Sequence, residues 1–298
     1  MDTENNVMKT YVVIHNKNSR GRNLKEEYIN KLFESNNLKY IYEATNSFEE
    51  LDQKIKLYND SSKYQYCTIG GDGSLNALVN SLMINNISNP EVSVLPAGSG
   101  SDFIRTFAIP QKIEEAISHL CTENYYEVDV GLVRNHNNEK YFVNVLNIGF
   151  LADSVETSEK FPNIIRKFRY PISFWLRIIF ASASQTYIST DRGEFNGSAF
   201  NISVCNAQYF GGGWNISPKS SLQDGLFNVQ IFAVTKLKAM KIFFLAKSGL
   251  HLKEASVVVK KTSNIKLMTD QAIEIDGDYF GDGPAEIFIK KRAIRFKI

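Results

Sequence analysis

Residues 64–80 read YQYCTIGGDGSLNALVN and predict a strand, a glycine-rich loop and a helix in direct succession. Glycine lacks a Cβ atom, so the backbone N–H groups of residues 70–74 can turn toward a bound anion. The amino end of the following helix adds a positive dipole end, and together these features suit a phosphate chain. A tight strand-to-helix turn that binds nothing is the alternative interpretation of a single loop of this kind. The helix itself is expected from apolar residues at helical spacing, namely Leu75, Leu78, Val79 and Leu82.

A second loop of small residues strengthens the phosphate-binding interpretation. Residues 92–95 predict a short strand, residues 96–101 (PAGSGS) form a small-residue turn, and a helix is expected next. The first predicted strand, residues 10–14, also ends in a polar and basic loop, which contains Asn16 and Ser19. The carboxyl ends of neighbouring parallel strands form the crevice in which open α/β sheets bind ligands. We therefore expect the three loops to converge on one anionic ligand.

Several classes of site are excluded by the sequence. Neither GxGxxG after the first strand nor GxxxxGK[ST] occurs, so a dinucleotide-binding Rossmann site and a P-loop are not predicted. Lys and Arg total 34 against 32 Asp and Glu, and the net charge of +2 is too balanced for a nucleic-acid-binding surface. The three cysteines show no Cys-x-x-Cys spacing, which argues against a zinc site or a disulfide framework and fits a reducing cytoplasm. The most apolar stretch, residues 170–183, is interrupted by Arg177 and is shorter than the roughly 20 residues of a membrane-spanning helix.

The pattern of predicted secondary structure changes near residue 128. Before that point, short strand-like runs alternate with longer helical patterns, which is typical of an open, mostly parallel sheet. After it, strand-like segments separated by turn residues predict a mainly β domain. Residues 160–185 are the exception and predict a helix, or a pair of helices broken near Pro171. Residues 293–298 alternate apolar and basic side chains and predict an edge strand.

Five segments resemble, in their order along the chain, the motif set of the diacylglycerol kinase catalytic-domain family. They are GGDGSLNALVN from residue 70, PAGSGSDFIRTF from residue 96, DVG from residue 129, ISPKSSLQDGLFNV from residue 216 and IDGDYFGDGP from residue 275. The family includes bacterial lipid kinases and the eukaryotic sphingosine and ceramide kinases. The resemblance extends over nearly the whole chain, to about residue 284, and ordered motifs of this kind are far more specific than any one of them.

The resemblance implies an α/β fold with two domains. Residues 1–128 are expected to form a three-layer α/β/α nucleotide-binding domain of the type shared by NAD kinases and diacylglycerol kinases, with residues 290–298 packed back on it. Residues 129–289 are expected to form a β-sandwich-like domain that takes the lipid. The implied activity is that of a cytoplasmic kinase that uses ATP and Mg²⁺ to phosphorylate a lipid hydroxyl, with a diacylglycerol-like acceptor.

The resemblance also implies where ATP and Mg²⁺ would bind. An acidic cluster that organises magnesium and water around the phosphates is matched by Asp72, Asp102 and Asp129. Asp224 matches a structural magnesium site that the backbone carbonyls of Ser221 and Leu226 complete, and oxygen-only ligands suit a hard cation. Ser74 and Ser99 stand where the family has Thr, and Ser101 stands where it has Asn. The other residues expected to bind the nucleotide are Gly70, Gly71, Gly73, Ser74, Asn76, Thr45 and Ser99, together with Asn16 and Ser19 of the first loop.

The catalytic residues implied by the resemblance are Asp276 and Asp278. They belong to Asp-Gly-Asp, which stands where the family has Asp-Gly-Glu, and their implied role is to take the proton of the lipid hydroxyl. A weak carboxylate base is adequate because the transition state of phosphoryl transfer is loose. Aspartate at position 278 shortens the reach by about one methylene, and a displacement of about 1 Å can lower a rate on the order of 10²-fold. A plain hairpin turn is the alternative interpretation of Asp-Gly-Asp on its own.

Basic and aromatic residues interleave over residues 160–180, which is the composition of a helix at a membrane interface. We expect this segment to meet anionic lipid as a peripheral contact at the inner face of a membrane. A helix packed between domains, with a solvated basic face, is the alternative. The expected partners are thus a lipid substrate and a membrane surface, with a second copy of the chain in a homodimer as a further candidate.

Two other functions remain open at this point. An NAD kinase-like phosphotransferase would share the GGDG loop, but the sequence lacks an Asn-Glu pair like the one with which that family holds its dinucleotide. In such an enzyme Asp-Gly-Asp would also have no role. A non-catalytic regulator that binds nucleotide or lipid is the second alternative, because Ser101 and Asp278 depart from the family pattern.

Overall fold

The computed structural model describes residues 9–18, 24–98, 101–165 and 168–298. The chain divides into two compact units. The first unit comprises Met1–Val128 and Ala293–Ile298, and the second comprises Asp129–Arg292. The strands β5 (Tyr125–Arg134) and β16 (Ala285–Lys297) carry the chain from one unit to the other.

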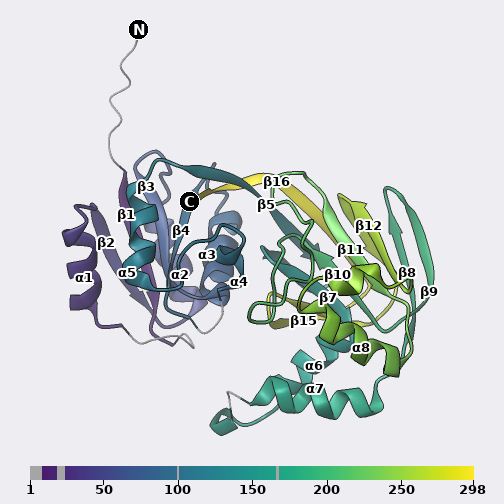
Figure 1. Cartoon of the computed structure of the whole chain (residues 1–298). Helices are drawn as coiled ribbons and strands as arrows, with labels where there is room; N and C mark the ends of the chain where they lie inside the picture. The colour runs from purple at the N-terminus through teal and green to yellow at the C-terminus, as the bar shows by residue number, and fades with distance from the viewer. Residues whose placement is uncertain (1–8, 19–23, 99–100, 166–167) are drawn as a thin grey trace. The chain divides into compact units, whose positions relative to one another are not determined.

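The first unit is built on a parallel sheet (Figure 1). Its strands are β1 (Thr10–Asn16), β2 (Tyr40–Thr45), β3 (Tyr64–Gly70) and β4 (Glu91–Pro96). They are ordered β2-β1-β3-β4, and the end of β16 joins β4 in parallel. β1, β3 and β4 are buried along almost their whole length, as strands of a parallel sheet are when helices cover both faces. The predicted open parallel sheet is therefore confirmed.

Helices cover both faces of this sheet. They are α1 (Glu26–Ser35), α2 (Phe48–Leu57), α3 (Asp72–Ile84), α4 (Asp102–Arg105), α5 (Ile113–Ala116) and the 3₁₀ helix η1 (Ile117–Cys121). α1 connects β1 to β2, and α2 and α3 connect β2 to β3 and β3 to β4, which runs across the sheet in the opposite direction. Crossover connections between parallel strands are right-handed. α1 therefore lies on one face of the sheet, and α2 and α3 lie on the other. Ile29 and Phe33 of α1 are buried, and the side chain of Ser47 caps α2 by accepting the N–H of Glu50 at 3.3 Å. This is the three-layer α/β/α arrangement expected from the resemblance.

The second unit is a β-sandwich. One layer has the antiparallel order β12 (Val257–Thr262), β11 (Phe227–Phe232), β10 (Asn201–Cys205), β7 (Val145–Gly149), β14 (Ala272–Ile275), β15 (Asp278–Asp282). The other layer contains β8 (Ser184–Thr190), β9 (Gly193–Ala199), β13 (Asn264–Leu267) and part of β16, together with β5 and β6 (Glu139–Phe142). Leu146, Ile202, Ile265 and Ile287 are among the buried side chains of the core that both layers share. The predicted C-terminal β-sandwich-like domain is confirmed.

A helical layer covers the outer face of the β7–β10–β11 sheet (Figure 1). Its elements are α6 (Phe150–Glu159), α7 (Arg169–Phe180), α8 (Lys236–Ala246) and η3 (Leu250–Lys253), and the 3₁₀ helix η2 (Asn163–Ile165) lies between α6 and α7 in the chain. Phe150, Ile178 and Phe243 from three of these helices pack in one apolar cluster with side chains of the sheet. Arg177 of α7 pairs with Asp153 of α6 at 2.9 Å, which ties the two helices together.

The prediction for residues 160–185 was wrong in where it placed the break. The interruption falls between Glu159, where α6 ends, and Arg169, where α7 begins. Pro171 lies in the first turn of α7, where a missing N–H removes no hydrogen bond within the helix. The helix ends at Phe180, and β8 begins at Ser184. α6 and α8 were not predicted, because residues 160–185 were the only helical segment expected in the mainly β region after residue 128.

Candidate active site

The carboxyl ends of the parallel strands bring predicted nucleotide-binding residues to one edge of the sheet in the first unit. Asn16 at the end of β1 lies opposite Thr45 at the end of β2. Gly70 at the end of β3 lies opposite Pro96 at the end of β4. Since β1 also pairs with β3, the four strands end at a common edge, where loops of an open α/β sheet bind their ligand.

The glycine-rich loop after β3 leads directly into α3, for which Gly71 is the N-cap residue. A Cβ atom on Gly70 would lie 2.2 Å from Oγ of Ser74, so the strand end can approach the helix only as glycine. A Cβ atom on Gly73, in contrast, would meet no atom within 4 Å. Open space therefore borders the first turn of α3, where backbone N–H groups and the helix dipole favour an anion.

The carboxylate of Asp72 joins the first loop to the second. Its oxygens accept the backbone N–H groups of Asp102 at 2.9 Å and Phe103 at 3.0 Å and so cap the amino end of α4. Asp102 is buried, and its carboxylate lies 3.5 Å from Nε of Arg105. Asp72 was predicted to lie beside a phosphate that carries a metal ion, and in the structure its carboxylate holds the backbone of the neighbouring loop.

The other predicted nucleotide-binding residues differ in what they contact. Thr45 is fully buried, and its Oγ1 has no hydrogen-bond partner among the described residues. A buried hydroxyl in that state is unfavourable unless a ligand or water satisfies it. Asn76 is buried, and its side-chain oxygen accepts Nδ2 of Asn80 at 3.0 Å. Ser19 and Ser99 lie outside the described residues.

Asp129 belongs to the second unit, unlike Asp72 and Asp102. Its carboxylate accepts the backbone N–H groups of Gly225 and Arg292, each at 2.7 Å. Burial raises the pKa of Asp129, and these two hydrogen bonds oppose the shift. Within its unit, Asp129 therefore anchors the loop that contains the predicted structural metal site.

That loop exposes the carboxylate of Asp224. Asp224 accepts the backbone N–H of Leu226 at 3.1 Å and pairs with Nζ of Lys261 at 3.0 Å. Within the described ranges, no group of three or more His, Cys, Asp or Glu side chains could hold a metal ion. A cation at this loop would therefore depend on Asp224, on the backbone carbonyls of Ser221 and Leu226 and on water, and it would replace the ammonium group of Lys261.

The Asp-Gly-Asp turn (residues 276–278) connects β14 to β15. Asp276 has φ = +50° and Gly277 has φ = +97°, as the tight hairpin turn requires. The carboxylate of Asp276 accepts the three backbone N–H groups of residues 143–145 at 2.9–3.0 Å. These bonds fix the turn against the end of the segment that leads from β6 into β7.

Asp278 is the exposed carboxylate of this turn. Its side chain is 59% exposed, and its Oδ2 lies 3.3 Å from Nζ of Lys140. Of the two predicted catalytic residues, Asp278 thus has an exposed carboxylate, whereas the carboxylate of Asp276 holds the turn in place. The base role itself stays a prediction.

Sequence reasoning missed Glu274, a third carboxyl group beside the turn. Glu274 is 5% exposed, and it accepts the backbone N–H of Gly277 at 2.6 Å and Nδ2 of Asn147 at 2.7 Å. Burial raises the pKa of Glu274 to about 8, and the nearby charges of Asp276 and Asp278 act in the same direction. One charged residue in the apolar run Ala272–Ile275 is the signal that could have revealed it.

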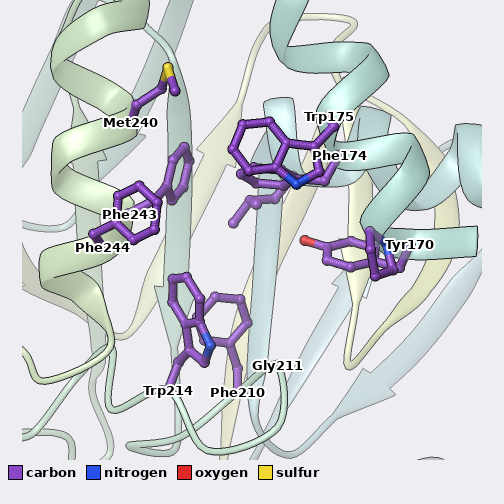
Figure 2. Close-up of a pocket in the computed structure, with 11 residues that line it drawn as sticks. Tyr170, Phe174, Trp175, Phe210, Gly211, Trp214, Met240, Phe243 and Phe244 are labelled. Carbon is purple, nitrogen blue, oxygen red and sulfur yellow. The ribbon is translucent and has the colours of Figure 1, made fainter. Parts of the chain in front are cut away.

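An apolar pocket of about 280 Å³ opens in the helical layer of the second unit. Its walls come from α6, α7, α8 and the loop of residues 210–214, and Figure 2 shows the hydroxyl group of Tyr170 pointing toward the space that they enclose. Burial and the nearby carboxyl of Glu274 raise the pKa of Tyr170. Most of the lining side chains are aromatic or aliphatic, among them Leu151, Phe174, Trp175, Trp214, Met240 and Phe243.

Large apolar side chains are exposed on two of the helices that line this pocket. On α7 they include Trp175 at 53%, Ile179 at 60% and Phe180 at 83%, and on α8 they include Leu237 at 82% and Phe244 at 70%. Such a concentration of exposed apolar surface usually marks an interaction site. Among the helices that the structure describes, none is both long and apolar enough to span a membrane.

Comparisons with known proteins give the site its context. Residues 10–133 match the diacylglycerol kinase catalytic domain, and residues 144–297 match the YegS C-terminal NAD kinase beta sandwich-like domain. A diacylglycerol kinase of Staphylococcus aureus (strain bovine RF122 / ET3-1) is 31% identical over 229 residues, which are 76% of this chain and 71% of that protein. The diacylglycerol kinase of Staphylococcus haemolyticus is 29% identical over 229 residues, 76% of this chain and 68% of that protein.

Solved structures agree with this fold. The crystal structure of a diacylglycerol kinase from Bacillus anthracis has a TM-score of 0.71 at 18% identity and covers 97% of this chain and 96% of its own. Another structure from that organism has a TM-score of 0.77 at 20% identity, with the same coverage. At these identities the likeness shows the fold, and the family follows from the sequence matches. This chain therefore belongs to the diacylglycerol kinase family and is a lipid kinase.

Proposed function

We propose that this lipid kinase transfers the γ-phosphoryl group of ATP to the free hydroxyl group of diacylglycerol. The observation that carries the proposal is the apolar pocket of about 280 Å³, which lies in the same unit as the Asp-Gly-Asp turn. Apolar walls with one hydroxyl group, that of Tyr170, suit an acyl chain better than a nucleotide or a sugar. The relatives in Staphylococcus, which are named diacylglycerol kinases, support the same acceptor.

The edge of the parallel sheet fits the triphosphate of ATP. Gly73 borders open space at the start of α3, and Thr45 supplies a buried hydroxyl for which the described residues provide no partner. The donors that would hold the phosphates are the backbone N–H groups of the glycine loop, the side chains of Ser74 and Thr45, and the loop with Asn16. The predicted residues Ser19 and Ser99 would add hydroxyl groups.

Mg²⁺ fits this site because it usually takes one or two carboxylates and completes its shell with phosphate and water oxygens. Asp102 would supply a carboxylate beside the glycine loop, and Asp224 would hold a second ion with backbone carbonyls. The ion would neutralise negative charge on the transferred phosphoryl group. Asp72 and Asp129 would act indirectly, because their oxygens already hold backbone N–H groups.

In the proposed reaction the lipid hydroxyl oxygen attacks the γ-phosphorus of ATP. The bond from that phosphorus to the bridging oxygen breaks, and its electron pair leaves with ADP. The hydroxyl proton passes to the carboxylate of Asp278 and from there to water. Lys140, at 3.3 Å, orients this carboxylate, and Asp276 keeps the turn rigid through its bonds to residues 143–145.

We also propose that α7 and α8 contact an anionic membrane, from which the acyl chain enters the pocket. Both helices line the pocket and expose apolar side chains, and the basic residues Lys238 on α8 and Lys247 directly after it are also exposed. Apolar burial together with attraction to anionic lipid is how amphipathic helices bind at an interface. A cytoplasmic enzyme at the inner membrane face is consistent with this contact.

The proposal is tested by offering ATP labelled at the γ-phosphate to a panel of acceptors. The panel contains diacylglycerol, phosphatidylglycerol, a sphingoid base, undecaprenol and NAD, each with Mg²⁺. We expect label in diacylglycerol. Label in another lipid alone would replace the proposed acceptor, and label in NAD alone would overturn the lipid assignment.

A further inference from the structure

Glu274 is a buried carboxyl group that the roles described above do not use. Because Ile273 and Ile275 belong to the sandwich core, alternation along β14 turns Glu274 toward the helical layer. One of its oxygens accepts the N–H of Gly277, the middle residue of the Asp-Gly-Asp turn, at 2.6 Å. The other accepts Nδ2 of Asn147 at 2.7 Å. Glu274 is thus bonded directly to the turn that carries the predicted catalytic residues.

A buried chain of polar side chains continues from Glu274 to the pocket. Oγ of Ser203 donates to Oδ1 of Asn147 at 2.6 Å, and Nδ2 of Asn201 donates to Oγ of Ser203 at 3.1 Å. Oδ1 of Asn201 accepts the backbone N–H of Leu151 at 3.0 Å, and Leu151 lines the pocket. These side chains are all buried and bonded to one another, so they hold each other in fixed positions.

We propose that Glu274 is a positioning residue for phosphoryl transfer, which fixes the Asp-Gly-Asp turn through the N–H of Gly277 and is itself held by the polar chain that ends at the pocket. The inference rests on the proposed function, in which Asp278 of this turn acts on the lipid hydroxyl. A displacement of about 1 Å at a reacting group can lower a rate on the order of 10²-fold, so a rigid attachment of the turn matters for the rate.

The charge state of Glu274 bears on this role. Burial raises its pKa to about 8, with further increases from the carboxylates of Asp276 and Asp278, while the hydrogen bonds from Asn147 and Gly277 oppose the shift. Glu274 is therefore mostly neutral at neutral pH and becomes an anion as the pH rises above its pKa. Ionisation places a third negative charge beside the turn and so opposes the approach of the phosphoryl group.

The charged groups that shift the pKa of Glu274 most are the carboxylates of Asp276 and Asp278, and both raise it. From α7, the phenol of Tyr170 lies close enough to have its own pKa raised by Glu274. From α6, the carboxylate of Glu159 accepts at 3.1 Å the N–H of Tyr279, which lies opposite Glu274 in the strand pair.

The test follows phosphorylation of diacylglycerol in phosphatidylglycerol vesicles from about pH 6 to about pH 10. For the wild-type chain we expect kcat to fall roughly tenfold per pH unit above about pH 8. Glu274→Gln stays neutral, so the decline should disappear. At neutral pH the Glu274→Gln change should lower kcat about threefold, because an amide N–H₂ group would replace an oxygen that accepts a hydrogen bond, such as the bond from Nδ2 of Asn147. The KM for ATP should not change.

Two further variants separate positioning from a purely structural role. Glu274→Asp is too short to keep both bonds, so we expect kcat to fall by at least about tenfold with an unchanged KM for ATP and a thermal transition that shows a folded protein. Glu286→Gln, on the exposed side of β16, serves as the matched control and should keep the wild-type rate and pH profile.

The outcomes distinguish this inference from the proposed function. A wild-type chain that labels no diacylglycerol overturns the proposed function and this inference with it. A wild-type chain that labels diacylglycerol, while Glu274→Gln shows the same pH profile and Glu274→Asp the same kcat, overturns the role of Glu274 alone.

Discussion

The carboxylate of Asp72 accepts the backbone N–H of Asp102 at 2.9 Å and so links the loops that follow β3 and β4. We expect Asp72→Ala to lower the free energy of unfolding by about 1–2 kcal/mol, because α4 loses its cap. ATP should also bind more weakly, because the two loops are no longer held together. Chemical denaturation and nucleotide titration measure the two effects. Glu27→Ala on the exposed surface of α1 is the control, and equal behaviour of the two variants would contradict the link.

The glycines of the first loop should respond differently to alanine. At Gly73 a methyl group meets no protein atom within 4 Å, so Gly73→Ala should fold normally, and it should raise the KM for ATP because the methyl group occupies the phosphate space. At Gly70 the methyl group would lie 2.2 Å from Oγ of Ser74, so Gly70→Ala should lower the melting temperature. Melting curves and ATP kinetics on both variants test this, and a Gly73→Ala protein with an unchanged KM for ATP speaks against a phosphate site there.

The buried carboxyl of Glu274 should make stability depend on pH. Its pKa is about 8 in the folded chain against an ordinary value of 4.5, so between these pH values the folded state keeps a proton that the unfolded state has released. The free energy of unfolding then falls as the pH rises, by about 1.4 kcal/mol per pH unit, and the loss ends above the folded pKa. Glu274→Gln does not titrate, so its melting temperature should rise relative to that of the wild type across this range. If the melting temperatures of the two proteins changed in the same way with pH, the raised pKa of Glu274 would be refuted.

The exposed apolar residues of α7 should mediate membrane contact. Ile179 and Phe180 are 60% and 83% exposed, so changing both to Ser should leave the melting temperature nearly unchanged. Binding to phosphatidylglycerol vesicles should weaken by at least about tenfold, because an inserted phenylalanine side chain contributes about 2 kcal/mol. Co-sedimentation measures the binding, with Leu57→Ser on α2, where Leu57 is 69% exposed, as the control. Unchanged binding would contradict the contact, and a dimer that the double change dissociates would assign this surface to a second copy.

The fold could be predicted where local chemistry determines it. The glycine loop after residue 69 and the small-residue loop after residue 95 predicted parallel strands with loops at one edge, and the structure has them. α8 could not be predicted in the same way. It buries Ile242 and Phe243 but exposes Leu237 and Phe244, so its apolar residues surround the helix and show no clear period.

The partners of the predicted site residues could not be inferred from the sequence. Asp72 holds a backbone N–H that is 30 residues away, and Asp129 holds those of Gly225 and Arg292, which are 96 and 163 residues away. A resemblance to a motif gives the type of residue and an implied role, but such contacts form only when distant segments pack. The same is true of Glu274, whose burial depends on β7 and on the helical layer.

The most direct test of the account compares the rate of diacylglycerol phosphorylation by the wild-type chain, Asp278→Asn and Asp270→Asn. Asp270 is an exposed aspartate of the same unit and provides the matched control. We predict that the wild-type and Asp270→Asn proteins label diacylglycerol at similar rates and that Asp278→Asn is slower by about 10²-fold or more, the contribution expected of a general base. A wild-type protein that binds ATP but labels no diacylglycerol would contradict the proposed reaction. An Asp278→Asn protein with the wild-type rate would contradict the role of Asp278 as the general base.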